Sequence, residues 1–363
     1  SKMAPESWKQ SDMASKLVQE IAQKEEGVPE RFILKQGETL DATDASPGLW
    51  EDTLLIDFSL LSSDSSSSTP AGQNELSKLQ YALKHWGCFQ IKNHGMTSLF
   101  LEELLQVSRE FFGLPLEERL KCCMKDDFLN GYGHVAPSIG NLPVNWNDRL
   151  SLTVSPQDRI KFDLWPQNPP KFREILKEYS LNLKNILEVI LKAMAKSVDL
   201  KEDSFLKQHG KQGPIDTRFG FYPRCPHPDR VYGLHPHSDR STITILLPDK
   251  DVVEGLQVEK DDQWFKVPVI SGALFINLGD FGEVMSNGVF KSALHRVVTN
   301  AEKDRVSITA FCVPDPQAEV GPIDELISPE HPKMYNSVDM KNFKQLLYKI
   351  YPIGRSLVDA LKI

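Results

Sequence analysis

The segment "GLHPHSDRSTITILLP", residues 233–248, places two imidazoles and a carboxylate at every second position. These are His235, His237 and Asp239, and an alternating apolar run follows them. Because successive side chains of a strand alternate faces, all three would point the same way, about 6 to 7 Å per step. Two of them could share a metal ion. An exposed loop ahead of the strand is the competing interpretation, and it requires no function.

A third histidine favours the metal. In "KSALHRVVTN", His295 shares a strand face with Ala293 and Val297, in a segment otherwise fit for burial. Two histidines and one carboxylate, with other positions left to water or substrate, form the facial triad of non-haem Fe(II) oxygenases. His237, Asp239 and His295 would supply that triad.

The segment "DRVSITAF" predicts a strand that carries an arginine, and Arg305, Ser307 and Phe311 fall on one of its faces. An inward arginine with a hydroxyl two residues later can hold a carboxylate in a bidentate clamp. Such a pair suits a small dicarboxylate bound next to the metal. The alternative is a surface arginine paired with Asp304 or Glu302, which is the commoner case for a lone arginine.

These residues need strands to position them. From Thr217 onward the chain reads as short apolar or alternating runs broken by Gly, Pro, Asn and Asp, which favours an antiparallel sandwich or barrel. Before it we expect short strands at "TLLIDFSLL" and "GCFQIKNHG", an irregular stretch over 127–170, and helices. The expected helices are "SKLVQEIAQ", "NELSKLQYALKHWG", "TSLFLEELLQVSREFFGLPLEERLKCCM", "PKFREILKEYSLNLKNILEVILKAMAKSVDL", "VDMKNFKQLLYKIY" and "RSLVDALKI".

The composition excludes several classes of protein. The chain has 363 residues, 40% of them hydrophobic, which suits one large core. Its net charge is -8, and no basic stripe is visible, so we expect no nucleic-acid partner. No apolar run approaches the ~20 residues of a membrane helix, and no secretory signal is visible, so we expect a cytoplasmic protein. We also expect a monomer. The five cysteines form no CxxC pair, so we expect free thiols.

The segments "FGFYPRCPHPDRVYGLHPHSD", "SNGVFKSALHRVVTN" and "RVSITAF" resemble the plant soluble 2-oxoglutarate- and Fe(II)-dependent dioxygenases. That group contains flavonol synthase, anthocyanidin synthase and alkaloid O-demethylases. Further blocks, such as "WGCFQIKNHG", "FFGLPLEERLK" and "WNDRLSLTVSP", extend the resemblance over nearly the whole chain. It implies a mainly β fold with α additions, in which a double-stranded β-helix (a cupin-like jelly roll) carries a helical N-terminal region and a C-terminal helix.

We therefore expect four segments along the chain. Residues 1–126 would form an N-terminal α/β region that packs on the core, and residues 127–216 the irregular segment and long helix. Residues 217–318 would form the jelly-roll core, and residues 319–363 a C-terminal helical segment.

The resemblance also assigns roles to single residues. The family pattern G-L-x-x-H-[ST]-D falls on His237 and Asp239 and leaves His235 at a variable position. The distal ligand histidine of the family matches His295. The R-x-S pair that grips the far carboxylate of 2-oxoglutarate matches Arg305 and Ser307.

The tyrosine of the Tyr-Pro element matches Tyr222, a candidate donor to the same carboxylate. One departure stands two residues before this tyrosine, where many members carry Asn and this chain has Gly220. Because that Asn contributes to cosubstrate binding in relatives, its absence bears on the pose or affinity of 2-oxoglutarate.

The implied activity is a dioxygenase that uses Fe(II), 2-oxoglutarate and O2, with ascorbate as a reductant. It would hydroxylate or O-demethylate a small aromatic specialised metabolite, such as an alkaloid or flavonoid, and release succinate and CO2. We expect the substrate pocket to use Phe311, Tyr335 and the stretch 128–146, including Tyr132. One alternative is a catalytically silent jelly-roll binding protein, which only Gly220 favours. The other is a zinc hydrolase, for which the sequence offers no separate general base.

Overall fold

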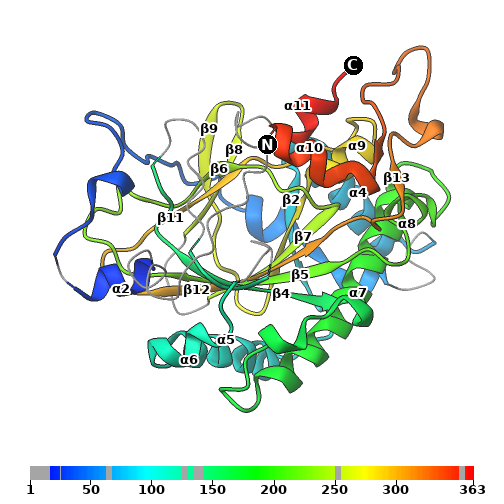
Figure 1. The fold of residues 1–363 in the computed structure, drawn as a ribbon. Coiled ribbons are helices and arrows are strands. Elements are labelled where there is room, and N and C mark those ends of the chain that lie inside the picture. Colours follow the sequence, from blue (N-terminus) through cyan, green and yellow to red (C-terminus); the bar gives the residue numbers. More distant parts are fainter. Residues whose placement is uncertain are drawn as a thin grey trace.

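The computed structural model describes residues 17–24, 26–62, 68–124, 130–134, 143–249, 255–350 and 356–363. Two sheets face each other to form the core (Figure 1). The larger sheet has eight strands in the order β1-β2-β10-β7-β12-β5-β4-β3, and the smaller has four in the order β6-β11-β8-β9. This arrangement confirms a mainly β fold with helical additions and a double-stranded β-helix core.

The larger sheet contains β1 (Leu55–Asp57), β2 (Cys88–Lys92), β3 (Gly131–Gly133), β4 (Asp148–Ser155), β5 (Ile215–Tyr222), β7 (Ile243–Pro248), β10 (Leu274–Leu278) and β12 (Arg305–Cys312). The smaller sheet contains β6 (Tyr232–His237), β8 (Leu256–Lys260), β9 (Gln263–Lys266) and β11 (His295–Val298). A separate pair joins β13 (Glu319–Val320) and β14 (Val338–Asp339). The strands before residue 217, which are β1 to β4, thus share one sheet with four strands of the expected 217–318 core. The boundaries of the four expected segments stay a prediction.

The longer helices cover the outer face of the larger sheet. They are α4 (Pro70–His85), α5 (Ser98–Phe112) and α7 (Phe172–Ser197), and Figure 1 shows α5 and α7 beneath β4, β5 and β12. The outward residues of β12, Ile308 and Ala310, are fully buried against this layer. Apolar burial on this face therefore forces the alternate residues of each strand inward, toward the smaller sheet.

The remaining helices are short. They are α2 (Val18–Gln23), α3 (Phe58–Leu61), α6 (Leu116–Leu120), α8 (Ser204–His209), α9 (Asp280–Met285), α10 (Phe343–Ile350) and α11 (Leu357–Leu361). The last two confirm that helices lie near the C-terminal end, but the expected helix 338–351 is wrong at its start, because Val338–Asp339 form strand β14. No helix in the described ranges is long and apolar enough to span a bilayer. All five cysteines are free thiols, as expected.

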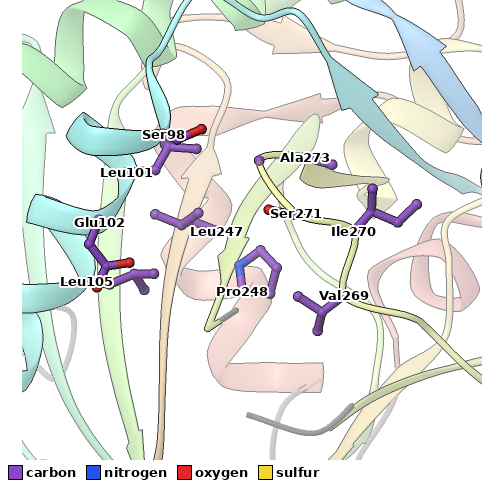
Figure 2. Close-up of a pocket in the computed structure, with 11 residues that line it drawn as sticks. Ser98, Leu101, Glu102, Leu105, Leu247, Pro248, Val269, Ile270, Ser271 and Ala273 are labelled. Atoms are coloured by element: carbon purple, nitrogen blue, oxygen red, sulfur yellow. The ribbon is translucent and has the colours of Figure 1, made fainter. Parts of the chain in front are cut away.

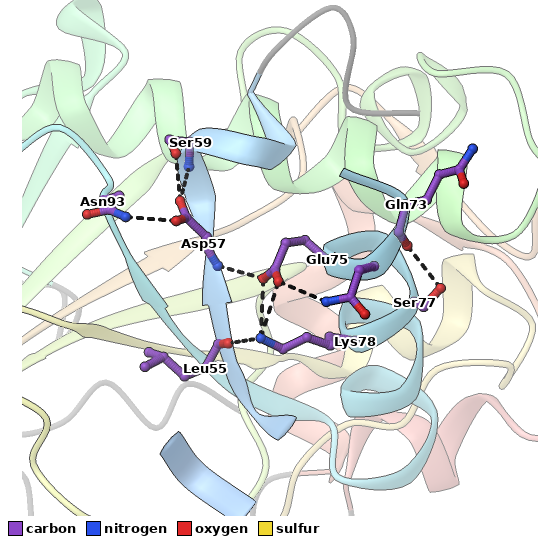
Figure 3. Close-up of polar contacts among 9 residues, drawn as sticks. Leu55, Asp57, Ser59, Gln73, Glu75, Ser77, Lys78 and Asn93 are labelled. Carbon is purple, nitrogen blue, oxygen red and sulfur yellow. Dashed lines mark hydrogen bonds and ion pairs between the residues drawn. The ribbon is translucent and has the colours of Figure 1, made fainter. Parts of the chain in front are cut away.

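The expected strand "TLLIDFSLL" is wrong in its second half, because β1 ends at Asp57 and α3 follows at once. The side chain of Asp57 accepts hydrogen bonds from the backbone N–H and the hydroxyl of Ser59, which caps the new helix. The backbone N–H of Asp57 donates to Glu75 of α4 at 2.7 Å (Figure 3). These local polar contacts end the strand despite its apolar sequence.

The expected irregular stretch 127–170 is wrong over Gly131–Gly133, which form the short strand β3, and over residues 148–155, which form the eight-residue strand β4. Its sequence "DRLSLTVS" alternates polar and apolar residues, and the outward Leu150, Leu152 and Val154 are buried. The Pro-, Gly- and Asn-rich sequence before it hides this alternation. Residues 125–129, 135–142 and part of the serine-rich segment, 63–67, lie outside the described residues.

Candidate metal centre

Three side chains from two neighbouring strands and one loop converge at the end of the core. His237 ends β6, Asp239 follows it, and His295 begins β11, directly opposite His237 in the antiparallel ladder. One ligand atom from each residue lies within 4.8 Å of the other two. The Nε2 atoms of His237 and His295 lie 3.5 and 3.6 Å from Oδ1 of Asp239. The expected triad is thus assembled in space.

Backbone contacts orient both imidazoles. Nδ1 of His237 lies 2.8 Å from the carbonyl oxygen of His235, and Nδ1 of His295 lies 3.0 Å from that of Ala293. Because a carbonyl only accepts, each Nδ1 carries the proton and each Nε2 keeps a lone pair. Both lone pairs are therefore available to one ion, which is the arrangement that metal-binding histidines use.

The electrostatics favour the ligand forms of these groups. Burial alone would raise the pKa of Asp239, but the facing His295 and His237 outweigh it and hold that pKa well below its usual range. Burial lowers the pKa of His295. An ionised carboxylate beside a neutral imidazole is what a divalent cation binds. The residues present therefore fit an Fe(II) ion.

His235 does not join the triad. Its backbone N–H donates to Oδ1 of Asn145 at 2.8 Å, which fixes β6 against the segment before β4. Its ring centroid is 6.4 Å from that of His237, whereas the His237 and His295 centroids are 4.3 Å apart. Within the segment "HPHSD", His237 and Asp239 are therefore the two residues that join His295 in the cluster that could hold a metal ion.

The clamp residues lie on the inner face of the larger sheet. Arg305 of β12 is paired with Tyr222 of β5, and Ser307 with Gly220. The guanidinium of Arg305 lies 4.3 Å from the centre of the Tyr222 ring. Its Nη2 is buried and has no hydrogen-bond partner within the described part of the chain. A buried charged donor left in this state fits an anionic ligand such as the far carboxylate of 2-oxoglutarate.

Gly220 does not leave an empty space. A Cβ atom at this position would lie 3.0 Å from Oγ of Ser307 and 3.2 Å from Cε2 of Tyr222. Another glycine, Gly233, lies against the opposite edge of the same ring, since its Cβ would lie 2.9 Å from Cδ1 of Tyr222. The tyrosine ring and the serine therefore crowd the position that a side chain at residue 220 would take.

The expected pocket residues differ in position. Phe311 lies on the inner face of β12, with the guanidinium of Arg218 4.7 Å from its ring centre. Tyr132 is fully buried, and its hydroxyl accepts a hydrogen bond from Arg119, so it packs in the core rather than facing an open pocket. Tyr335 is also buried, and its hydroxyl donates to Glu283 at 2.7 Å. Of these three residues, Phe311 alone lies on the inner face of the larger sheet, the face that carries Arg305 and Ser307 and is called the inner wall below. Residue 128 lies outside the described residues.

Three residues near the site, Asn277, Arg149 and Arg218, were not predicted from the sequence. Asn277 of β10 donates to Oδ2 of Asp239 at 2.9 Å. The sequence feature that could have predicted Asn277 is its position as the single amide side chain in the apolar run "GALFINLG". The two arginines share the inner face with the clamp, and the alternation of β4 was the signal for Arg149.

Two small cavities adjoin Pro248 at the end of β7. One, of about 60 Å³, lies between α5 and residues 269–273 and has mostly apolar walls that include Leu101 and Leu247 (Figure 2). The other, of about 20 Å³, is bordered by Phe275 and Arg305 and therefore reaches the clamp. Neither is lined by a residue of the triad.

Comparison with known proteins supports this site. Residues 211–314 match the 2OG-Fe(II) oxygenase superfamily, and residues 55–170 match a family described as non-haem dioxygenase in morphine synthesis N-terminal. The chain is 34% identical to codeine O-demethylase of Papaver somniferum over 93% of this chain and 92% of that protein. It is 37% identical to flavonol synthase 1 of Crocosmia x crocosmiiflora over 72% and 79%.

A solved structure is also similar. The crystal structure of JOX2 in complex with 2OG, Fe and JA superposes with a TM-score of 0.83 and 30% identity. The match covers 96% of this chain and 97% of that one.

Proposed function

Since this chain belongs to the 2OG-Fe(II) oxygenase superfamily, we propose that it hydroxylates or O-demethylates a small aromatic specialised metabolite, such as an alkaloid or flavonoid. It is an Fe(II)- and 2-oxoglutarate-dependent dioxygenase, an oxidoreductase. The proposal concerns the substrate and the outcome of the oxidation. We also infer that the protein works as a cytoplasmic monomer and that ascorbate supports it as a reductant.

One observation carries the reaction class. The three ligand atoms of His237, Asp239 and His295 lie within 4.8 Å of one another, on the core whose inner wall carries the buried guanidinium of Arg305. A metal triad beside a cationic anchor is what a dicarboxylate cosubstrate requires, because one end must reach the ion and the other needs a counter-charge. A zinc hydrolase needs no such anchor.

Each residue has a distinct role. His237, Asp239 and His295 would hold the Fe(II) ion. Arg305 and Ser307 bind the far carboxylate of 2-oxoglutarate, and Tyr222, whose ring centre lies 4.3 Å from the guanidinium of Arg305, is a further donor to that carboxylate. When bound, Fe(II) and 2-oxoglutarate supply the oxidation, in which O2 is consumed and the cosubstrate leaves as succinate and CO2.

The names of relatives support the substrate class. Codeine O-demethylase is named for a reaction on an alkaloid, and flavonol synthase for the formation of a flavonoid. Phe311 on the inner wall adds a flat apolar surface of the kind against which an aromatic ring stacks.

The first test is anaerobic reconstitution with Fe(II) followed by 2-oxoglutarate. We expect a weak visible metal-to-ligand charge-transfer band, and succinate when air is admitted. The band should be lost in His237→Ala and kept in His235→Ala, which is the matched control because it alters the same segment outside the triad.

Other outcomes would identify the alternatives. A folded protein that binds Fe(II) but shows neither the band nor succinate would favour a silent binding protein. Hydrolysis of an ester or amide with zinc bound, independent of O2 and 2-oxoglutarate, would favour the zinc hydrolase. Product analysis with candidate alkaloids and flavonoids then tests the substrate class.

A further inference from the structure

The inner face of the larger sheet carries two arginines besides the clamp. Arg149 of β4 lies opposite Gly220 of β5, and Gly220 lies opposite Ser307 of β12. Arg218 lies two residues before Gly220 and therefore on the same face. Cross-strand diagonal neighbours lie about 7 to 8 Å apart, within reach of two long side chains. The pair Arg149 and Arg218 thus forms a second cationic site beside the clamp.

The side chains of Arg149 and Arg218 are both half-buried. The Nε atoms of Arg149 and Arg218 are buried from solvent. The guanidinium of Arg218 lies 4.7 Å from the ring centre of Phe311. Gly220 lies between Arg149 and Ser307 in the cross-strand row, and the ring of Tyr222 and Oγ of Ser307 lie over its position.

The inner face of the larger sheet continues from these arginines across β12, β7 and β10 toward the triad. Phe311 lies opposite Thr244 of β7, and Thr244 lies opposite Asn277 of β10, which donates to Asp239. Since neighbouring strands lie about 4.8 Å apart, the backbone of Phe311 is roughly 10 Å from that of Asn277. A small aromatic molecule anchored at the arginines could therefore lie along Phe311 and reach the metal centre.

The charges on this wall favour an anion. Asp216, two residues before Arg218, is the acidic neighbour on the same face, and the hydroxyl of Thr153 donates to it at 2.6 Å. Asp148 is fully buried and accepts backbone N–H groups of the N-terminal helix. Arg149, Arg218 and Arg305 therefore bring three guanidinium groups to three neighbouring strands of this face, β4, β5 and β12.

We propose that Arg149 and Arg218 bind a carboxylate group of the primary substrate, so that the enzyme oxidises an aromatic acid. This inference rests on the proposed function, which it narrows to one substrate class. The two arginines act on the substrate, whereas Arg305 acts on the cosubstrate. Guanidinium groups suit this role because they remain charged and bind carboxylates through paired N–H donors.

The test compares acids with their uncharged amides. Phenylacetate, 3-phenylpropionate and cinnamate, each beside its primary amide, are titrated calorimetrically into the anaerobic protein, with and without Fe(II) and saturating 2-oxoglutarate. We expect at least one acid to bind roughly tenfold or more tightly than its amide. Arg149→Gln and Arg218→Gln should each weaken that acid by roughly tenfold and leave the amide unchanged.

Arg224→Gln is the matched control, because it removes one positive charge from an exposed turn just after β5. It should leave acid binding unchanged. All variants should keep the charge-transfer band, which shows that the metal and cosubstrate still bind. If no acid binds better than its amide, or if both glutamine variants keep the preference, the proposal is wrong. A wild-type protein without the band would instead overturn the dioxygenase, whatever the acids do.

Discussion

Asn277 donates a hydrogen bond to Oδ2 of Asp239 at 2.9 Å, and the other oxygen of that carboxylate faces both His237 and His295. The amide fixes which oxygen is left for a metal ion. It also offsets part of the cost of burying the carboxylate, since a buried charge needs hydrogen bonds. Asn277 is therefore a positioning residue for the metal centre.

Asn277→Ala should weaken Fe(II) binding by about 10- to 100-fold, the usual cost of removing a partner that orients a metal ligand. Equilibrium dialysis against Fe(II) under anaerobic conditions measures this. Asn300→Ala, which removes an amide from a surface turn, is the control and should bind Fe(II) normally. Equal affinity in the Asn277 variant and the wild type would show that Asp239 orients itself without the amide.

Arg305→Lys should raise the dissociation constant of 2-oxoglutarate by at least roughly tenfold, because an ammonium cannot reproduce the paired N–H donors of a guanidinium. Titration of the charge-transfer band with 2-oxoglutarate measures the change. Fe(II) binding should be unaffected, since Arg305 lies apart from the triad. Arg224→Lys makes the same exchange on the surface and should change nothing. If Arg305→Lys bound 2-oxoglutarate as tightly as the wild type does, the clamp would act through its charge alone and not through paired donors.

Alternation predicted that His237 and Asp239, and likewise Arg305 and Ser307, share a strand face, because each pair lies two residues apart in the sequence. The resemblance to known dioxygenases was needed to leave His235 out of the triad. The residues that sequence missed depend on which strands are neighbours. Asn277 meets Asp239 only because β10 lies beside β7. Arg149 joins the wall only because β4 pairs with β5 at Gly220. The order of the strands and the register in which they pair are set by contacts between residues distant in the sequence, and no local sequence pattern encodes these contacts.

Gly220→Asn should weaken 2-oxoglutarate binding rather than restore a family contact. A Cβ there would lie 3.0 Å from Oγ of Ser307 and 3.2 Å from the ring of Tyr222, so both must shift. We expect the dissociation constant of 2-oxoglutarate to rise by roughly tenfold, with a smaller rise for Gly220→Ala. Titration of the charge-transfer band checks both.

Gly113→Ala is the control for this series, because Gly113 ends α5 with an ordinary negative φ and lies away from the clamp. It should bind 2-oxoglutarate as the wild type does. Tighter binding in Gly220→Asn would mean that the added amide contacts the cosubstrate and that Tyr222 and Ser307 move aside readily.

Asp148 links helix α2 to the larger sheet and should make stability depend on pH. Its two carboxylate oxygens accept the backbone N–H groups of Val18 and Gln19 at 2.9 and 2.8 Å. Burial raises the pKa of Asp148 from 3.8 to about 7, and the two N–H bonds only partly oppose this shift. The folded protein therefore holds the proton of Asp148 more tightly than the unfolded chain does.

The stabilising effect of this proton is complete below pH 3.8 and is lost as the pH rises through about 7. The melting temperature of the wild type minus that of Asp148→Asn should therefore fall between pH 5 and pH 8, since the neutral amide has no proton to lose. Asp203→Asn is the control: the hydrogen bond from Lys207 lowers the pKa of Asp203, so this difference should stay constant over that range. A difference that rises with pH for Asp148→Asn would mean that the two N–H donors stabilise the ionised form more than burial penalises it.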